Sequence, residues 1–129
     1  MNLEETYAIV TGGASGLGEA TVRAIISGGG KVAILDMDSI RGNELVNELG
    51  TSAIFCKTDV TNEGDVKSAI EKTIETFGKL NVAMNFAGIA IAVKTIGRDG
   101  PHDLDLYRKV VDVNLNGTFN VSRLAAEYI

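Results

Sequence analysis

The sequence predicts a doubly wound α/β fold, in which a mostly parallel sheet is covered by helices on both faces. Three observations carry this prediction. Short apolar runs alternate with amphipathic segments, a glycine-rich turn follows the first apolar run, and fifteen glycines against one proline suit tight turns between strands and helices. With 129 residues, of which 45% are hydrophobic, we expect one domain with its own core.

The elements follow in order from the hydrophobic spacing. Each apolar run of a few residues is typical of a buried strand, and each stretch with apolar residues three and four apart is typical of a helix. This alternation requires a parallel sheet, for which we expect the strand order 3-2-1-4. The expected strands are 7–10, 31–35, 53–57 and 80–85, and the expected helices are 17–27, 39–50, 61–77 with Thr61 as N-cap, and 104–129.

The turn at residues 11–18 has its glycines spaced G-x-x-x-G-x-G. We expect one glycine to let the chain turn, the next to keep side chains away from a ligand, and the last to let the helix approach the strand. The first N–H groups of the helix would then point at the pyrophosphate of a dinucleotide, aided by the helix dipole. The alternative is a turn that only joins a strand to a helix. The residues expected to contact the ligand are Gly12, Ser15, Gly16, Leu17 and Gly18.

An acidic residue closes the second strand. Asp36 lies 18 residues beyond Gly18, near the separation of about 20 at which a carboxylate reaches the adenosine ribose hydroxyls of a Rossmann-type fold. Its charge favours NAD and repels the additional phosphate of NADP, and neither Ser15 nor Met37 supplies a compensating cation. An aspartate that only caps the next helix is the alternative.

Composition and charge exclude several classes of protein. The net charge is −5 and no cluster of Lys and Arg occurs, which argues against nucleic acid as a partner. Cys56 is the only cysteine, so disulfides within the chain and cysteine zinc sites are excluded, and no metal site is expected. No apolar stretch is long enough to span a bilayer, and the acidic start at residues 1–6 does not fit a signal peptide. We therefore expect a cytoplasmic protein, or a mitochondrial matrix protein in a eukaryote, without a membrane partner.

Four motifs together resemble the short-chain dehydrogenase/reductase family over nearly the whole chain. The resemblance implies a specific role for each motif after the glycine turn. One motif receives the adenine, one braces the sheet and lines the nicotinamide ribose, and one supplies the family's helix asparagine. In the second of these, Phe86 stands where the family has an asparagine, although the backbone there can still line the ribose. The residues are Asp59 and Val60 for the adenine, Asn85, Phe86, Ala87 and Gly88 for the sheet and ribose, and Asn114 as the catalytic asparagine.

Each of these motifs also has a simpler interpretation. Asp59 could simply start the turn before the third helix, without contacting a ligand. Residues 85–88 could be an ordinary turn at the end of a strand, with glycine in a left-handed conformation. Asn114 could be a polar residue without a role, although asparagine competes with the helical backbone. A P-loop protein is excluded, because the chain has no G-x-x-x-x-G-K-[ST] motif.

Three further segments, 88–93, 97–102 and 117–121, resemble the 3-hydroxyacyl-CoA dehydrogenase type 2 branch of this family. The resemblance implies oxidation of 3-hydroxyacyl-CoA thioesters, and of some hydroxysteroids, by hydride transfer from the hydroxyl-bearing carbon to NAD. The segment 89–103 would then lie near the substrate entrance, unless it is only a surface connection. His102 is expected to be a surface residue, because no carboxylate or nucleophile can be assigned to it as a partner.

The catalytic set that the resemblance implies is incomplete. The family uses an Asn, a Ser and a Tyr-x-x-x-Lys pair, in which the tyrosine is the general acid/base. Of this set only Asn114 is present, because none of Tyr7, Tyr107 and Tyr128 is followed by a lysine four residues later. We therefore expect a dehydrogenase truncated before its Tyr-Lys segment, which binds nucleotide without turnover. The alternative is a short protein that binds NAD, or uses a helix face for assembly, without catalysis.

The last helix, over residues 104–129, carries two apolar faces and ends without a Gly, Asn or Pro stop signal. One face is expected to pack on the sheet, and the resemblance implies that the other packs on a partner subunit, so we expect a homo-oligomer. The fourth strand would be left as an open edge of the sheet. The first face comprises Val110, Val113, Val121 and Leu124, and the second comprises Val111, Leu115, Phe119, Ser122, Ala126 and Ile129.

Overall fold

The computed structural model describes residues 2–129 and has a four-stranded parallel sheet at its centre. At the middle of this sheet, Ile9 is in register with Ala33 on one neighbouring strand and with Ala83 on the other. The predicted fold class and strand order are confirmed, although the fourth strand begins two residues later than expected. In the order β3-β2-β1-β4, the strands are β3 (Ala53–Lys57), β2 (Lys31–Asp36), β1 (Tyr7–Thr11) and β4 (Val82–Asn85).

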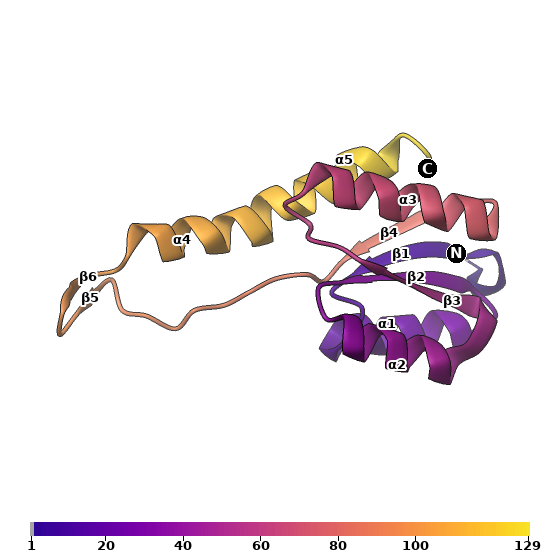
Figure 1. Cartoon of the computed structure of the whole chain (residues 1–129), viewed down its shortest axis with the longest axis horizontal. Coiled ribbons are helices and arrows are strands. Elements are labelled where there is room, and N and C mark those ends of the chain that lie inside the picture. Colours follow the sequence, from indigo (N-terminus) through magenta and orange to yellow (C-terminus); the bar gives the residue numbers. More distant parts are fainter. Residues whose placement is uncertain (1) are drawn as a thin grey trace.

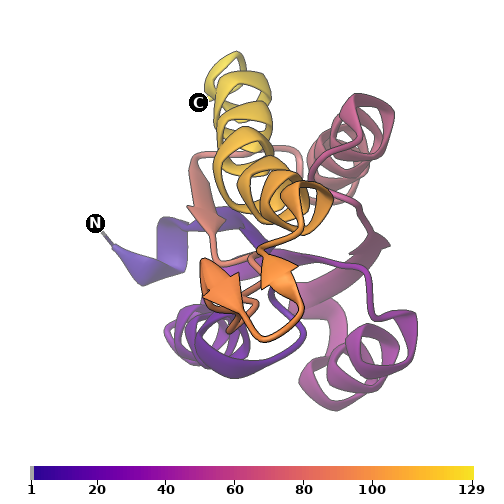
Figure 2. The same ribbon diagram turned by 90° about the vertical axis from the view of Figure 1, so that its left-hand side faces the viewer.

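Helices cover both faces of the sheet, as predicted (Figure 1 and Figure 2). Because successive residues of a strand point to opposite faces, β1 buries Val10 among the side chains of α1 and α2 and Ile9 among those of α3 and α5. Cys56 belongs to the second of these two clusters, and burial raises the pKa of its thiol. The helices are α1 (Gly16–Ser27), α2 (Ser39–Leu49), α3 (Glu63–Phe77) and α5 (Thr118–Ala126), with 3₁₀ turns η1 (Leu3–Glu5) and η2 (Gly50–Ser52).

The helix ends show which local signals act. Asp38 caps α2 through its carboxylate, and Gly78 ends α3 in the left-handed region at φ 77°. The N-cap of α3 is Asn62, so the prediction of Thr61 was wrong by one residue. Both residue types cap helices well, and the amide and hydroxyl of Thr61 instead donate to Asp59 Oδ1.

The single helix expected over residues 104–129 is in fact composite. α4 (Leu104–Val111) and α5 are joined by a π-helical segment, η3 (Asp112–Gly117), which contains Asn114. A π-helical insertion is uncommon and is frequently found at functional sites. The regular helix ends at Ala126 rather than at the last residue.

The two apolar faces of this composite helix have different surroundings. Val121 and Leu124 are buried against the sheet, whereas Leu115 and Phe119 are 65% and 67% exposed. In Figure 1, α4 projects beyond the sheet, next to a hairpin formed by β5 (Ile96–Gly97) and β6 (Gly100–Pro101). Within residues 2–129, no helix combines the length and apolarity that crossing a bilayer requires.

Candidate functional site

A cavity of about 710 Å³ lies where the carboxyl ends of β1, β2 and β4 meet. This is the edge at which open α/β sheets bind ligands, and the volume is within the range of small-molecule sites. The cavity is lined by the ends of these strands and the segments that follow them, by the turn after β3, and by the composite helix where α4 meets η3. Its residues are Gly12, Ser15, Gly16, Leu17, Gly18, Leu35, Asp36, Met37, Thr58, Asp59, Val60, Phe86, Ala87, Gly88, Ile89, Lys109 and Val113.

The turn between β1 and α1 leaves the start of the helix open toward this cavity. Ser15 is the N-cap in an extended conformation, but its side chain makes no capping hydrogen bond. The first N–H groups of a helix have no partner within the helix, so those of Gly16, Leu17 and Gly18 are donors that a ligand can use. Gly16 has φ 55°, and a Cβ atom built on it would meet no atom within 4 Å. The turn thus has the shape and the donors of an anion cradle.

Two glycines of this turn are held by close backbone contacts. A Cβ on Gly12 would lie 2.7 Å from the amide nitrogen of Ala87 and 2.8 Å from the carbonyl carbon of Phe86. A Cβ on Gly18 would overlap the carbonyl oxygen of Gly12. The turn is therefore packed against the segment after β4 and under the first turn of α1.

The carboxylate of Asp36 is fixed at the end of β2. Its Oδ2 accepts a hydrogen bond from the Ala14 amide at 3.0 Å, and its Oδ1 accepts one from the Asp38 amide at 3.0 Å. The N-cap of α2 is Asp38, so the alternative that Asp36 only caps this helix is wrong. Asp36 is thus hydrogen-bonded to the glycine turn and lines the cavity. Each of its carboxylate oxygens still has a lone pair that can accept a hydrogen bond from another donor.

Asp59 and Val60 line the cavity after β3. Asp59 Oδ1 accepts hydrogen bonds from the amide and hydroxyl of Thr61, at 2.9 and 2.7 Å, so it also builds the turn before α3. Asp59 thus starts the turn before α3, as its simpler interpretation expects, and it lines the cavity as well. Val60 is braced from behind by α5, because the Asn120 side-chain amide donates to its carbonyl at 2.9 Å.

The segment after β4 is tied to the end of β1. The amide of Phe86 donates to the carbonyl of Thr11 at 3.0 Å, and the amide of Ala87 donates to the Thr11 hydroxyl at 3.2 Å. Phe86, Ala87 and Gly88 line the cavity, whereas Asn85 does not. Asn85 instead donates to the Ser122 hydroxyl at 3.3 Å, and its Oδ1 is buried without a partner.

Asn114 also lies outside the cavity lining but contacts a residue within it. Its Oδ1 accepts a hydrogen bond from the amide of Ile89, and its Nδ2 donates to the carbonyl of Ile89, both at 2.8 Å. This pair of bonds fastens the π-helical segment to the chain just after β4. His102 lies in the segment 89–103, which we call the arm. Its Nδ1 lies 2.7 Å from the Asp103 carbonyl, and it does not line the cavity.

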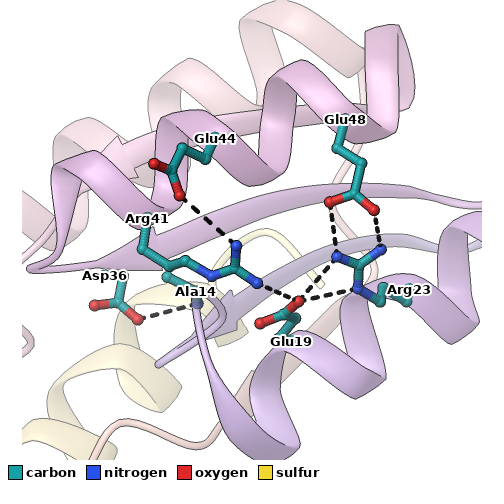
Figure 3. A network of polar contacts seen from close by, with 7 residues as sticks. All are labelled: Ala14, Glu19, Arg23, Asp36, Arg41, Glu44 and Glu48. Atoms are coloured by element: carbon teal, nitrogen blue, oxygen red, sulfur yellow. Dashed lines mark hydrogen bonds and ion pairs between the residues drawn. The ribbon is translucent and has the colours of Figure 1, made fainter.

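A group of charged side chains joins α1 to α2 beside the glycine turn (Figure 3). Glu19 pairs with Arg41 at 2.7 Å and with Arg23 at 2.9 Å, and Arg23 pairs with Glu48 at 2.7 Å. Hydrogen bonds from Arg41 and then Arg23 lower the pKa of Glu19 below its usual value. We call Glu19, Arg23, Arg41, Glu44 and Glu48 the α1–α2 ion-pair cluster.

Sequence reasoning missed several lining residues. Leu35 and Thr58 directly precede the predicted site residues Asp36 and Asp59. They would have been found if the residues next to each predicted acid had been included. Lys109 and Val113 carry no local signal, because their place in the lining depends on how the composite helix crosses the sheet.

The fold and the cavity define a Rossmann-type α/β protein, with a glycine-rich turn at a helix N-terminus and a carboxylate at the end of the second strand. The model of the short chain dehydrogenase family matches residues 6–129, and the chain belongs to this family.

Relatives and solved structures give the same assignment. The chain is 41% identical over 126 residues to a 3-hydroxyacyl-CoA dehydrogenase type-2 from Drosophila melanogaster, covering 96% of this chain and 49% of the relative. It is 43% identical over 121 residues to the Homo sapiens protein of that name, covering 92% and 46%. The chain spans about half the length of these relatives.

Two crystal structures are similar in fold. A 3-hydroxyacyl-CoA dehydrogenase type-2 from Mycobacterium avium superposes with a TM-score of 0.88 at 43% identity, over 97% of this chain and 49% of that one. A 3-ketoacyl-(acyl-carrier-protein) reductase from Brucella melitensis, complexed with NADH, gives a TM-score of 0.90 at 29% identity, over 98% and 50%. The resemblance to the type-2 branch that the motifs indicated is confirmed.

Proposed function

We propose that this chain forms the cofactor-binding part of an NAD-dependent oxidoreductase that transfers a hydride between NAD and a secondary alcohol. The observation that carries the proposal is the fixed carboxylate of Asp36 at the edge of a cavity that the adjoining glycine turn also lines. The family and the NADH-bound relative support a nicotinamide cofactor. The named relatives support 3-hydroxyacyl-CoA, or a related secondary alcohol, as the substrate class.

The residues present fit such a cofactor. Gly16 leaves open space where any other residue would place a side chain, and the free N–H groups of the first turn of α1 suit a pyrophosphate. Asp36 would accept hydrogen bonds from ribose hydroxyls, and its charge would repel a phosphate at the same place. Asp59 and Val60 would hold the adenine. When bound, the nicotinamide supplies the hydride chemistry.

The roles of this chain's residues in that chemistry are limited to binding and positioning. Asn114 holds Ile89 at both its amide and its carbonyl, and thereby fixes the cavity wall after β4. The Ser, Tyr and Lys that act on the substrate in this family have no counterpart at matching positions in the sequence. We therefore expect these 129 residues to bind nucleotide without catalysing turnover.

The test is a titration of the chain with NADH and NADPH, followed by the fluorescence of the reduced nicotinamide. We expect NADH to bind at least tenfold more tightly, and Asp36→Asn, which removes the charge and keeps the shape, to narrow that difference. Glu71→Gln is the matched control, because it removes one negative charge from the exposed face of α3. Equal affinities for the two nucleotides in the parent chain would contradict NAD specificity, and no binding of either would contradict the proposal itself.

Assembly through the composite helix is a second proposal, carried by the exposure of Leu115 and Phe119 on its free face. Large apolar side chains gathered on one surface are typical of an interface. The acids Asp103 and Asp105 at the start of α4 and the bases Arg108 and Lys109 in its last turn would complement each other between two antiparallel copies. Light scattering should give a dimer or larger for the parent and a monomer for Leu115→Asp; a monomeric parent would refute the idea.

A further inference from the structure

The α1–α2 ion-pair cluster lies just outside the cavity, on the side of the proposed ribose site. A short series of hydrogen bonds connects the two places. The amide of Arg41 donates to Asp38 Oδ1 at 3.0 Å, and the amide of Asp38 donates to Asp36 Oδ1 at 3.0 Å. The backbone of Arg41 is therefore fixed in the first turn of α2, two hydrogen bonds away from the carboxylate that would recognise the ribose.

The guanidinium group of Arg41 is directed away from that carboxylate, toward α1 (Figure 3). Its Nη2 lies 2.7 Å from Glu19 Oε1, and its Nη1 lies 3.8 Å from Glu44 Oε2. The Glu19 side chain is 17% exposed, against 39% for Arg41, and Glu19 is also held by Arg23 at 2.9 Å. Glu19 is thus the fixed member of the pair, and Arg41 is a long, half-exposed side chain that Glu19 retains.

We propose that Glu19 is a specificity-determining residue, which holds the guanidinium of Arg41 against α1 and so keeps a cation away from the ribose edge of the cavity. The inference rests on the proposed function, because it concerns the choice between NAD and NADP. An arginine without a carboxylate partner at this edge would bind a ribose phosphate with two parallel hydrogen bonds, a geometry that the ammonium group of lysine does not provide. Asp36 disfavours that phosphate by charge repulsion. Glu19 disfavours it by pairing with Arg41, whose positive charge would otherwise be free to bind the phosphate.

A purely structural role for Glu19 predicts a different result. If the cluster only joined α1 to α2, removal of any of its carboxylates would lower stability and leave the ratio of the two nucleotide affinities unchanged. Glu48 allows this comparison, because it pairs with Arg23 at 2.7 Å and carries the same charge, while its contacts do not include Arg41. Glu48→Gln is therefore the matched control for Glu19→Gln.

The experiment measures the dissociation constants of NADH and NADPH for the parent, Glu19→Gln, Arg41→Gln, the double variant and Glu48→Gln, with circular dichroism to establish that each is folded. Glu19→Gln should tighten NADPH binding about three- to tenfold, as expected for one partly exposed charge-assisted contact, and change NADH binding less than about twofold. The double variant should return to the parent ratio. Arg41→Gln and Glu48→Gln should each leave the ratio unchanged.

The outcomes separate this inference from the proposed function. If the parent binds neither nucleotide, or binds both equally, the proposed function fails and the inference falls with it. If the parent prefers NADH and Glu19→Gln does not change the ratio, only the inference is wrong. The inference is also overturned if Glu48→Gln shifts the ratio of the NADH and NADPH affinities as much as Glu19→Gln does, because the change in net charge would then explain both shifts. Should Glu19→Gln not fold, Arg41→Gln decides, since weaker NADPH binding in that variant would mean that Arg41 already reaches the phosphate.

Discussion

Alanine at two glycines of the turn should separate the requirements of folding from those of binding. Gly12 and Gly16 have φ 63° and 55°, so each Ala should cost about 1–2 kcal/mol of left-handed strain. A Cβ at Gly12 would also lie 2.7 Å from the Ala87 amide nitrogen, and such overpacking adds roughly 1–3 kcal/mol. A Cβ at Gly16 meets nothing within 4 Å. Gly12→Ala should therefore lower the free energy of unfolding by about 1–3 kcal/mol more than Gly16→Ala.

The assay is urea denaturation followed by circular dichroism, with nucleotide titration of each folded variant. Gly16→Ala should retain most of its stability and still bind NADH at least tenfold more weakly, because its methyl group would stand in the anion cradle. Equal loss of stability for the two variants would show that contact with the segment after β4 does not constrain the turn. Unchanged NADH affinity in Gly16→Ala would refute the placement of the pyrophosphate at this turn.

Three further predictions concern single contacts. Asn114→Ala removes two hydrogen bonds to Ile89, so it should cost about 1–3 kcal/mol and accelerate hydrogen exchange at the Ile89 amide, measured by NMR. Gly18→Ala should cost about 3 kcal/mol or more in thermal denaturation, although alanine favours helix, because its Cβ overlaps the Gly12 carbonyl oxygen. The pKa of Glu19 is lower in the folded state than its ordinary value of 4.5. Its ion pairs therefore stabilise the fold fully above pH 4.5, and this stabilisation is lost as the pH falls through the folded-state pKa. The difference in unfolding free energy between the parent and Glu19→Gln should accordingly be largest near neutral pH and shrink below pH 4.5 in urea titrations.

The sheet could be predicted from the sequence because its two central strands, β1 and β2, are buried on both faces. Runs such as residues 31–35 have no polar alternation, which indicates a parallel strand between two helical layers. The arm at residues 89–103 and α4 are harder to place in this way, because the helix from Leu104 onward was predicted but its projection beyond the sheet was not. They have few buried side chains, so hydrophobic spacing, the strongest sequence signal, carries little information there. The π-helical segment was missed because an i→i+5 hydrogen-bonded turn inside a helix has no composition or spacing signal of its own.

The cavity could be predicted for a topological reason. The carboxyl ends of parallel strands share one edge, so the glycine turn, Asp36 and the segment after β4 had to meet once the strand order was known. The cluster around Glu19 could not be predicted, because Glu19 and Arg41 are 22 residues apart and meet only where α1 and α2 lie side by side. The contacts of long charged side chains depend on how the helices pack, and no local sequence pattern indicates them.

The composite helix lines part of the cavity, and it also holds other lining residues in place from outside the cavity. Asn114 fastens Ile89 at one side of the cavity, and Asn120, almost two turns later, holds the carbonyl of Val60 at the other. Gly117, between them, lies so close to Val60 that a Cβ would be 2.5 Å from its methyl carbon. Most of the cavity-lining residues precede residue 90, but the positions of Val60 and Ile89 depend on residues 114–120. The asparagine that family resemblance marks as catalytic therefore has a positioning role here that requires no tyrosine or lysine.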